Sequence, residues 1–451
     1  MELPRRVFAW YGDDFTGSTD VLEVLASRGL SAVLFLQQPG EDSFQRFAEY
    51  RAFGLAGSSR SQSPAWMDHN LPPAFAWLRG LGAAICHYKV CSTLDSSPQV
   101  GSIGRALEIG QRVFETAYVP VVAGTPALRR YLVFGNLFAA AGAEIFRIDR
   151  HPTMSRHPVT PMDEADIRLH LGRQTNRRIE LMDLLDLGAP DAEERLAAKL
   201  SGRPGAVLFD GFDERSELCL GRLLWYSAFR QAFVVGSSGV AYALTAYWRE
   251  QGLLDAARAR RQPGEADRLV VLSGSCSPAT EQQIAHAGRN GFALVRLAAQ
   301  ALASGDGREA AIAAAVEDAL RVLREGHSVV LYTAAGAADR LSLGGAQEQL
   351  SLRQALGEQA GRILRAIVDA SGIRRVLVAG GDTSSHAVQQ LGVDALTFVC
   401  PLSPGAPLCR AWSRDAERDG LEIVLKGGQM GPEDFFTTVL RCGPRTELPT
   451  I

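Results

Sequence analysis

The sequence has no excess of positive charge, no long hydrophobic run and no paired cysteine motif. Its 451 residues include 47 Lys and Arg against 50 Asp and Glu, so the formal net charge is −3. Proteins that bind nucleic acid through its phosphates concentrate Lys and Arg, and this balance argues against that class. We therefore expect no nucleic-acid partner.

The most hydrophobic stretch, residues 131–143, is interrupted by Gly135 and Asn136. It is shorter than the roughly 20 apolar residues that a membrane-spanning helix requires, and we interpret it as a buried helix. Near the N-terminus only residues 7–11 are continuously apolar before two aspartates, too few for the core of a secretory signal. We therefore expect a cytoplasmic protein without a membrane partner.

Seven cysteines are scattered along the chain, and no two of them form a CxxC pair. An odd, scattered set argues against a disulfide framework and against a structural zinc site. We expect the cysteines to be reduced and mostly buried. The sequence identifies no ligands for another metal.

Hydrophobic residues make up 46% and charged residues 22% of the chain, close to the average of folded soluble domains. This composition disfavours long disorder, and the length predicts about two or three domains. Short β-rich runs alternate with helical patterns, which is typical of βαβ units around mainly parallel sheets. The predicted strands are residues 6–11, 32–36, 52–56, 84–90, 120–123, 206–209, 233–236, 269–272, 293–297, 328–332, 375–379 and 396–400. The predicted helices begin near Ser18 and Gly101 and include residues 308–324 and 346–370.

Residues 254–268 are polar, alternate in charge and contain a Pro-Gly pair, as linkers do. We predict a domain of residues 1–254, a linker of residues 255–268 and a second domain of residues 269–451. The expected fold class is α/β, with two α/β domains, mainly parallel sheets and an active site in the cleft between the domains. The sequence leaves open whether the chain forms a homo-oligomer.

Two adjacent acids, Asp13 and Asp14, follow the first predicted strand, and Asp20 and Glu23 have the spacing of a capping box for a helix that starts near Ser18. Ligands of open α/β sheets bind at the carboxyl ends of the strands, so the adjacent acids are candidates for a general base or for orienting a substrate hydroxyl. The alternative is an Asx turn with a helix cap, which explains one aspartate more easily than two.

Two later strands are also followed by a cation with several hydroxyl groups. Arg60 is suited to bind a carboxylate with two parallel hydrogen bonds, Lys89 adds a point charge, and Ser92 and Thr93 can donate to sugar oxygens, with Cys91 beside them. Each residue alone is more simply read as solvated surface. The convergence of three strand ends favours a site for an acidic polyol.

His157 is a further candidate for this site, although a single histidine is more often structural. The segment after it has the pattern of a helix start, with Thr160 as the N-cap, Pro161 at the first helical position and Asp163 three residues after the cap. Capping alone is therefore enough to explain the segment.

The C-terminal half contains three turns rich in Gly and Ser, and two of them follow predicted strands and precede predicted helices. Their backbone amides and the helix N-termini would face an anion. One such turn is more often only a tight bend, but three in one domain favour nucleotide binding. The candidate residues are Ser273, Gly274 and Ser275; Gly380, Gly381, Asp382 and Thr383; and Lys426, Gly427 and Gly428, with Gly405 in a further loop that could flank the base or ribose. No GxxxxGK[ST], GxGxxG, HExxH or GxSxG pattern occurs, which disfavours P-loop enzymes, Rossmann dehydrogenases, zincins and α/β-hydrolases.

Taken together, these motifs resemble the four-carbon acid-sugar kinases, ATP-dependent enzymes that phosphorylate threonate, erythronate or oxo-tetronate acids. The resemblance spans nearly the whole chain. It is carried by GDDFTGSTD (12–20), the Arg60 loop, YKVCSTLDSS (88–97), HPVTPMDEAD (157–166), LSGSCSPAT (272–280), AGGDTSSHA (379–387) and LKGGQMGPEDFF (425–436). It implies an N-terminal domain for the acid sugar, contacted by Asp13, Arg60 and residues 89–93, and a C-terminal domain for ATP, contacted by the Ser273, Gly381 and Gly427 turns.

The departures from the family pattern concern the choice of substrate. The threonate branch has a basic residue and Arg-Gly-Asn after its Ser-Thr pair, where this chain has Leu-Asp-Ser-Ser at residues 94–97. The chain is more similar to the oxo-tetronate branch, but it has Gly-Ser-Ile-Gly at residues 101–104 in place of Gly-Asn-Ile-Gly. A branched acid such as 3-oxo-isoapionate is therefore also open.

The expected reaction is attack of the terminal hydroxyl of the acid on the γ-phosphorus of ATP, with Mg²⁺ spanning the phosphates. Asp13, or alternatively Asp14, would accept the proton. A phosphatase with Asp13 as nucleophile is one alternative, although the D-x-D-x-T spacing of such enzymes is not met. A non-catalytic sensor that binds sugar acids between two lobes is the other, and the three phosphate-type turns would have no purpose in it.

Overall fold

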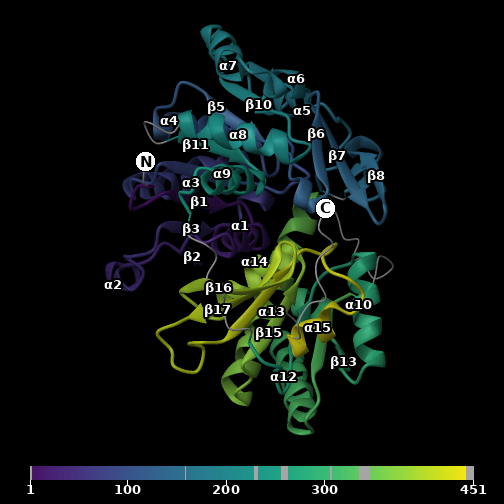
Figure 1. Cartoon of the computed structure of the whole chain (residues 1–451). Helices are drawn as coiled ribbons and strands as arrows, with labels where there is room; N and C mark the ends of the chain where they lie inside the picture. The colour runs from purple at the N-terminus through teal and green to yellow at the C-terminus, as the bar shows by residue number, and fades with distance from the viewer. Residues whose placement is uncertain are drawn as a thin grey trace. The chain divides into compact units, whose positions relative to one another are not determined.

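The structure is a computed structural model that describes residues 3–157, 159–227, 232–254, 263–304, 307–334 and 346–442, with only the backbone at residues 227, 304, 346–350 and 382–384. The chain divides into two compact units. Unit 1 consists of Met1–Val33 and Gly40–Arg258, and unit 2 of Leu34–Pro39 and Ala259–Ile451. In Figure 1 the colours of unit 1 run from purple to teal and those of unit 2 are mostly green to yellow.

Unit 1 is built on a parallel sheet with the strand order β3-β1-β4-β11-β5-β10-β9. These strands are β1 (Phe8–Gly12), β3 (Ala52–Ala56), β4 (Ile85–Lys89), β5 (Val119–Val122), β9 (Ile179–Met182), β10 (Ala206–Phe209) and β11 (Ala232–Gly236), while β2 (Ala32–Phe35) spans the division between the units. Six of these strands, β1, β3, β4, β5, β10 and β11, are buried along their whole length, because helices cover both faces of a parallel sheet.

The helices of unit 1 pack on this sheet and on one another, α1 against α9 and α3 against α4. They are α1 (Phe15–Ser27), α2 (Glu41–Gln45), α3 (Pro64–Gly80), α4 (Ile103–Phe114), α5 (Ile167–Gly172), α6 (Leu184–Gly188), α7 (Ala192–Ser201), α8 (Glu214–Ser227) and α9 (Gly239–Glu250). A separate antiparallel sheet holds β6 (Arg130–Val133), β7 (Asn136–Ala141) and β8 (Glu144–Arg147).

The strands of unit 2 follow the order β13-β14-β12-β15-β18-β17-β16. The first five strands are parallel, and β17 is antiparallel to both of its neighbours. Its strands are β12 (Val270–Ser273), β13 (Ala293–Arg296), β14 (Val329–Tyr332), β15 (Arg375–Ala379), β16 (Ala395–Ser403), β17 (Ala406–Trp412) and β18 (Glu422–Lys426).

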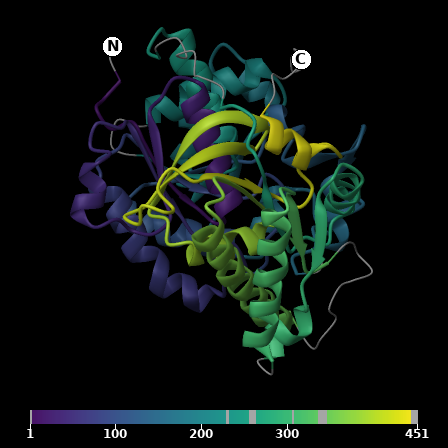
Figure 2. The same ribbon diagram turned by 90° about the horizontal axis from the view of Figure 1, so that it is seen from below.

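The helices of unit 2 are α10 (Pro278–Arg289), α11 (Ala299–Ser304), α12 (Arg308–Arg324), α13 (Ala346–Ser371), α14 (Gly381–Gln390) and α15 (Phe435–Arg441). The long helix α13 packs against α12 and α14, and α12 and α13 run side by side in the green part of Figure 2. The predicted α/β class with mainly parallel sheets is thus confirmed, and the strands predicted at residues 52–56, 206–209 and 375–379 have those bounds. Among the described residues no helix is long and apolar enough to cross a membrane.

The buried helix predicted at residues 131–143 is wrong. The segment forms most of β6 and β7, whose residues alternate between buried and partly exposed, so that Leu132, Leu137 and Ala139 point to the core. Phe134 and Gly135 connect the strands with positive φ angles of 49° and 79°. Two successive left-handed residues form the tight turn of a β-hairpin and interrupt any helix.

Two predicted helix starts are also wrong. Helix α1 begins at Phe15, three residues before Ser18, because the Asp14 side chain caps it. Asp20 and Glu23 therefore lie inside the helix and not at a capping box. Thr160 caps no helix, since α5 begins at Ile167 with Asp166 as its N-cap. The cysteines are not mostly buried as predicted: three of the seven are buried, Cys86, Cys409 and Cys442, and the other four are partly exposed.

The domain boundaries at residues 254 and 268 remain predictions. Residues 255–262 of the predicted linker lie outside the described residues.

Candidate functional site

Asp14 joins the end of β1 to helix α1 and to an arginine from a neighbouring strand end. Its Oδ1 accepts a hydrogen bond from the Gly17 backbone N–H at 2.5 Å, which satisfies one of the free donors at the helix N-terminus. Its Oδ2 accepts one from Arg60 Nη1 at 2.9 Å. Both carboxylate oxygens of Asp14 therefore have partners, and the cap that the sequence offered as the alternative is present.

Asp13 is fixed through its backbone and leaves its side chain uncommitted. Its N–H donates to the Lys89 carbonyl at 2.8 Å, and its own carbonyl accepts from the Arg60 N–H at 3.1 Å. The side chain is 4% exposed, and its Oδ1 has no hydrogen-bond partner within the described part of the chain. The pKa of Asp13 is raised to about 8, because burial and the adjacent Asp14 raise it more than Arg60 and Lys89 lower it.

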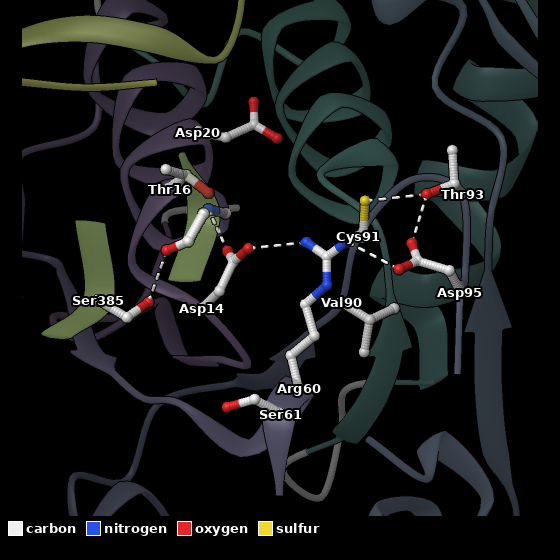
Figure 3. A network of polar contacts seen from close by, with 12 residues as sticks. Asp14, Thr16, Asp20, Arg60, Ser61, Val90, Cys91, Thr93, Asp95 and Ser385 are labelled. Carbon is white, nitrogen blue, oxygen red and sulfur yellow. Dashed lines mark hydrogen bonds and ion pairs between the residues drawn. The ribbon is translucent and has the colours of Figure 1, made fainter. Parts of the chain in front are cut away.

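Arg60 bridges two carboxylates. Besides Asp14, its Nη2 donates to Asp95 Oδ2 at 2.7 Å, and Figure 3 shows the guanidinium between the two acids. Asp95 Oδ1 accepts from the Thr93 hydroxyl at 2.6 Å, and that hydroxyl lies 3.0 Å from Cys91 Sγ. Burial alone would raise the pKa of Asp95, but Arg60 and its other partners lower it to about 2. The ends of β1, β3 and β4 are thus joined by one polar network.

The loop after β4 packs directly on the Arg60 backbone. Gly101 has a φ of 62°, and a Cβ at this position would lie 2.4 Å from the Arg60 carbonyl oxygen. Only glycine combines this left-handed backbone with so close an approach. The segment 101–104, which departs from the family pattern, therefore begins against the residue that organises the site.

Lys89 is buried at the end of β4. Its Nζ donates to the Val90 carbonyl at 2.8 Å and lies 3.8 Å from Asp20 Oδ2. Burial raises the pKa of Asp20, Lys89 lowers it, and Asp20 Oδ1 has no hydrogen-bond partner among the described residues. A side chain at Gly17 would come within 2.9 Å of Nζ, so this glycine keeps room for the ammonium.

His157 is tied to the network through Thr160. Its Nδ1 accepts from the Thr160 N–H at 3.1 Å, and the Thr160 hydroxyl lies 3.0 Å from the same atom and 3.3 Å from Asp95 Oδ2. His157 therefore has a structural role, because it holds Thr160, which in turn donates to Asp95. Ser92 is half-buried in the turn that follows β4.

Several residues of this edge were missed. Asp95 is the main one, together with Asp20 and the Ser237-Ser238 pair at the end of β11, where Ser237 Oγ lies 2.7 Å from Thr125 Oγ1. The signal for the serine pair was available, because a hydrophobic strand followed by Gly-Ser-Ser is the pattern that identified the other turns. Asp95 lacks such a signal, since its partner Arg60 is 35 residues away.

In unit 2 the three predicted turns lie together, since they follow the adjacent strands β12, β15 and β18. The Gly274 N–H donates to the Ala379 carbonyl at 3.1 Å, and the Gly380 N–H donates to the Lys426 carbonyl at 2.9 Å. Gly380 has a φ of 115°, a conformation that strongly favours glycine, and precedes α14. The antiparallel register of β17 with β18 brings Gly405, at the start of β17, to the same edge.

Lys426 is fully buried and supports the third turn. Its Nζ donates to Thr280 Oγ1 at 3.0 Å and to the Gly428 carbonyl at 3.3 Å, and burial lowers its pKa to about 7. Ser277 and Thr280 also donate to the Gly428 carbonyl. Helix α10, through Thr280 and its N-cap Ser277, therefore fixes the turn at Gly428 without a bound ligand.

The hydroxyl groups of Ser273 and Ser275 also lie at these turns. Ser273 Oγ is buried and has no hydrogen-bond partner in the described part of the chain, and Ser275 Oγ would lie 2.6 Å from a Cβ at Gly428. Side chains of Asp382 and Thr383 lie outside the described atoms. No group of three or more His, Cys, Asp or Glu among the residues described is arranged to hold a metal ion.

Comparison with known proteins assigns both units to described domains. Residues 8–244 match the family model of a sugar-binding N-terminal domain, and residues 270–436 match that of a nucleotide-binding C-terminal domain. The chain is 47% identical to the 3-oxo-isoapionate kinase of Paraburkholderia graminis over 96% of this chain and 94% of that protein. It is 31% identical to the 3-oxo-tetronate kinase of Cupriavidus necator over 97% of each chain.

Solved structures show the same fold. A protein of Salmonella typhimurium superposes with a TM-score of 0.71 at 24% identity, and one of Haemophilus influenzae with a TM-score of 0.66 at 23% identity. Each comparison covers 96% of this chain and 98% of the other.

The buried Asp13 gives a prediction for stability. Its pKa is raised in the folded state, so the folded protein holds a proton that the unfolded chain releases near pH 4, and stability falls as the pH rises from about 4 to about 8. Asp13→Asn removes this loss. We expect the variant to exceed the wild type in free energy of unfolding by a margin that grows from pH 5 to pH 8.5, measured by urea denaturation.

Asp95→Asn is the matched control, because Asp95 has the opposite shift. Its ionised form stabilises the fold above pH 4, and this contribution is lost only as the pH falls toward about 2. The variant should lose about 3 kcal/mol, since a buried ion pair is broken, and the loss should be equal at pH 5 and pH 8.5. If the change in free energy of unfolding caused by Asp13→Asn did not depend on pH, the raised pKa of Asp13 would be contradicted.

Proposed function

The chain belongs to the four-carbon acid-sugar kinase family and is an ATP-dependent acid-sugar kinase, and from this premise we propose that its acceptor is 3-oxo-isoapionate or a closely similar branched 3-oxo acid. The observation that carries the proposal is the 47% identity to a 3-oxo-isoapionate kinase, against 31% to a 3-oxo-tetronate kinase that is covered to a similar extent. The departures at residues 94–97 and 101–104, which border the Arg60 network, support it.

We assign the proton acceptor to Asp13. The reaction needs a group that takes the proton of the attacking hydroxyl, and both oxygens of Asp14 are already engaged by Gly17 and Arg60. Asp13 Oδ1 has no such commitment, and its pKa of about 8 is close to a neutral working pH. A base whose pKa is close to the working pH is matched to its task, because an ionised fraction is present there and the ionised form accepts a proton strongly.

The other residues of unit 1 would bind and orient the acid. Lys89, Ser92 and Thr93 offer a charge and hydroxyl groups at the end of β4, with Cys91 between them, and His157 supports the loop from outside. Arg60 holds Asp14 and Asp95 in place. Transfer has a loose transition state, so catalysis would rest on aligning the terminal hydroxyl with the γ-phosphorus of ATP and on neutralising the phosphate charge.

The glycine turns of unit 2 would bind the phosphates of ATP. The N–H groups of Gly274 and Gly380 already donate to strand carbonyls, so the donors would be other N–H groups of the three turns, at Ser275, Gly381–Thr383, Gly427 and Gly428. Helices α10 and α14 begin beside these turns. Gly405 would lie beside the nucleotide at the same edge. We place Lys426 as a support of the third turn that also contributes positive charge.

Mg²⁺ would enter with ATP. Kinases hold this ion through substrate phosphates and one or two carboxylates, and the lack of a metal cluster in the described residues fits that mode. When bound, the ion would neutralise charge on the phosphates. The sensor and the phosphatase considered from the sequence are disfavoured, because the relatives are named kinases.

The substrate assignment predicts the outcome of an acceptor screen. The purified chain is incubated with MgATP and 3-oxo-isoapionate, 3-oxo-tetronates, threonates or erythronates, and ADP release is measured. We expect release only with an acceptor present, with kcat/KM at least about tenfold higher for 3-oxo-isoapionate than for any other acid, since discrimination of one substituent is typically 10- to 200-fold. A higher value for a tetronate would contradict the assignment.

The role of Asp13 predicts a selective loss of turnover. Asp13→Asn should lower kcat by about 10² to 10⁴, the usual contribution of a general base, while the Kd for ATP measured by calorimetry stays within about twofold. The matched variant Asp163→Asn alters an exposed aspartate that pairs with Arg173, and it should leave kcat unchanged. Near-normal turnover of Asp13→Asn would remove the assigned role.

A further inference from the structure

The residue expected to bind the substrate carboxylate is already occupied in this structure. Each terminal nitrogen of Arg60 donates to an aspartate, Nη1 to Asp14 and Nη2 to Asp95. A substrate carboxylate that took either place would displace an aspartate and leave it unpaired in a buried position, which is costly. Arg60 is therefore better suited to position these acids than to bind the acid group of the sugar.

The charge at this edge of the sheet requires a further cation. The two cations described so far at this edge already face aspartates: Arg60 donates to Asp14 and Asp95, and Lys89 Nζ lies 3.8 Å from Asp20 Oδ2. An anionic substrate needs a positive group that is not already committed to an aspartate. That group must lie at the same edge of the sheet.

Arg130 lies at that edge through a continuous set of contacts. Its backbone pairs with Thr125, each N–H donating to the other carbonyl at 2.8 and 3.1 Å, in the segment that follows β5. The Thr125 hydroxyl lies 2.7 Å from that of Ser237, which follows β11, and β11 pairs with β4. Burial lowers the pKa of Arg130, and among its neighbours Cys91, at the end of β4, acts most strongly in the opposite direction.

Within the part of the chain that the structure describes, the guanidinium of Arg130 has no acid as a partner. Nη1 donates only to backbone carbonyls, those of Leu128, Arg129 and Ala140, at 3.1 to 3.4 Å. Nε is buried and has no hydrogen-bond partner, and no carboxylate of the described residues forms an ion pair with this side chain. A half-buried arginine whose charge is met only by carbonyls retains donors for a carboxylate.

We propose that Arg130 binds the carboxylate of the acid sugar and thereby makes the enzyme specific for acids over neutral polyols. This inference rests on the proposed function and adds to it the residue that recognises the anionic end of the substrate. Arg60 then acts as a positioning residue for Asp14 and Asp95. The acid is held between three strand ends, with its carboxylate toward β5 and its hydroxyl groups toward β1 and β4.

The test compares two substrates that differ only in charge, 3-oxo-isoapionate and its primary amide. The wild type should prefer the acid by about 10- to 100-fold in kcat/KM, the range expected for a charged hydrogen bond. Arg130→Gln should lower kcat/KM for the acid by a similar factor and barely change that for the amide, so that the ratio between them approaches one. Arg130→Lys should retain part of the preference, because charge is kept and the second hydrogen bond is lost.

Arg129→Gln is the matched control. This neighbouring arginine donates through both terminal nitrogens to the carbonyls of Gly142 and Ala143, away from the site. It should leave the ratio of acid to amide unchanged, and the KM for ATP should be unchanged in every variant. A merely structural role of Arg130 would lower activity on acid and amide alike.

An unchanged ratio in Arg130→Gln, or a ratio lost in Arg60→Gln and kept in Arg130→Gln, would overturn the inference. If Arg130→Gln fails to fold, Arg130→Lys decides, because a preference equal to that of the wild type would also overturn it. If the wild type forms no ADP with 3-oxo-isoapionate, the proposed acceptor is wrong. The same ratio is then measured with the acid of the panel that is phosphorylated and its amide.

Discussion

The bridge that Arg60 makes between Asp14 and Asp95 is the interaction on which the rest of unit 1's site depends. It joins the ends of three strands, since Asp14 follows β1, Arg60 follows β3 and Asp95 follows β4. The backbone of Arg60 also donates to the Asp13 carbonyl. Without this cation two buried carboxylates would face each other unpaired, at a cost of several kcal/mol.

The same bridge separates the chemical behaviour of neighbouring acids. Asp95 receives hydrogen bonds from Arg60 and Thr93 and stays ionised, whereas Asp13 is buried beside Asp14 with one oxygen unpartnered and holds its proton to about pH 8. Acids of identical chemistry thus acquire different roles from their surroundings. One supports the structure of the site, and the other is available to react.

The candidate site of unit 2 is built from backbone groups, whereas that of unit 1 is built from charged side chains. The edge proposed to bind ATP is formed by backbone amides, which need no counter-charge, and Ser277, Thr280 and Lys426 support the turn at Gly428 from α10 and β18. Rigid turns suit phosphate binding, because donors that are already placed lose little freedom when the ligand arrives. The division between charged side chains in unit 1 and amides in unit 2 fits the two domain models that the chain matches.

Local patterns in the sequence predicted much of this arrangement. Asp13, Asp14 and the turns after β12, β15 and β18 could be found because a hydrophobic strand followed by Gly, Ser or Asp is visible within ten residues. The hairpin at Phe134 and Gly135 was read as a helix, because its left-handed turn has no strong local signal. Asp95 and Arg130 could not be found, since their roles depend on partners distant in the chain.

The central claim is that Asp13 keeps its proton near neutral pH while Asp95, at the same edge of the sheet, is ionised. A ¹³C NMR titration of the aspartate carboxyl carbons, with Asp13→Asn to assign the resonance, measures this directly. The account predicts one resonance with a midpoint near pH 8 that is missing from the variant, and an Asp95 resonance that titrates near pH 2. An Asp13 midpoint below pH 5 would contradict it.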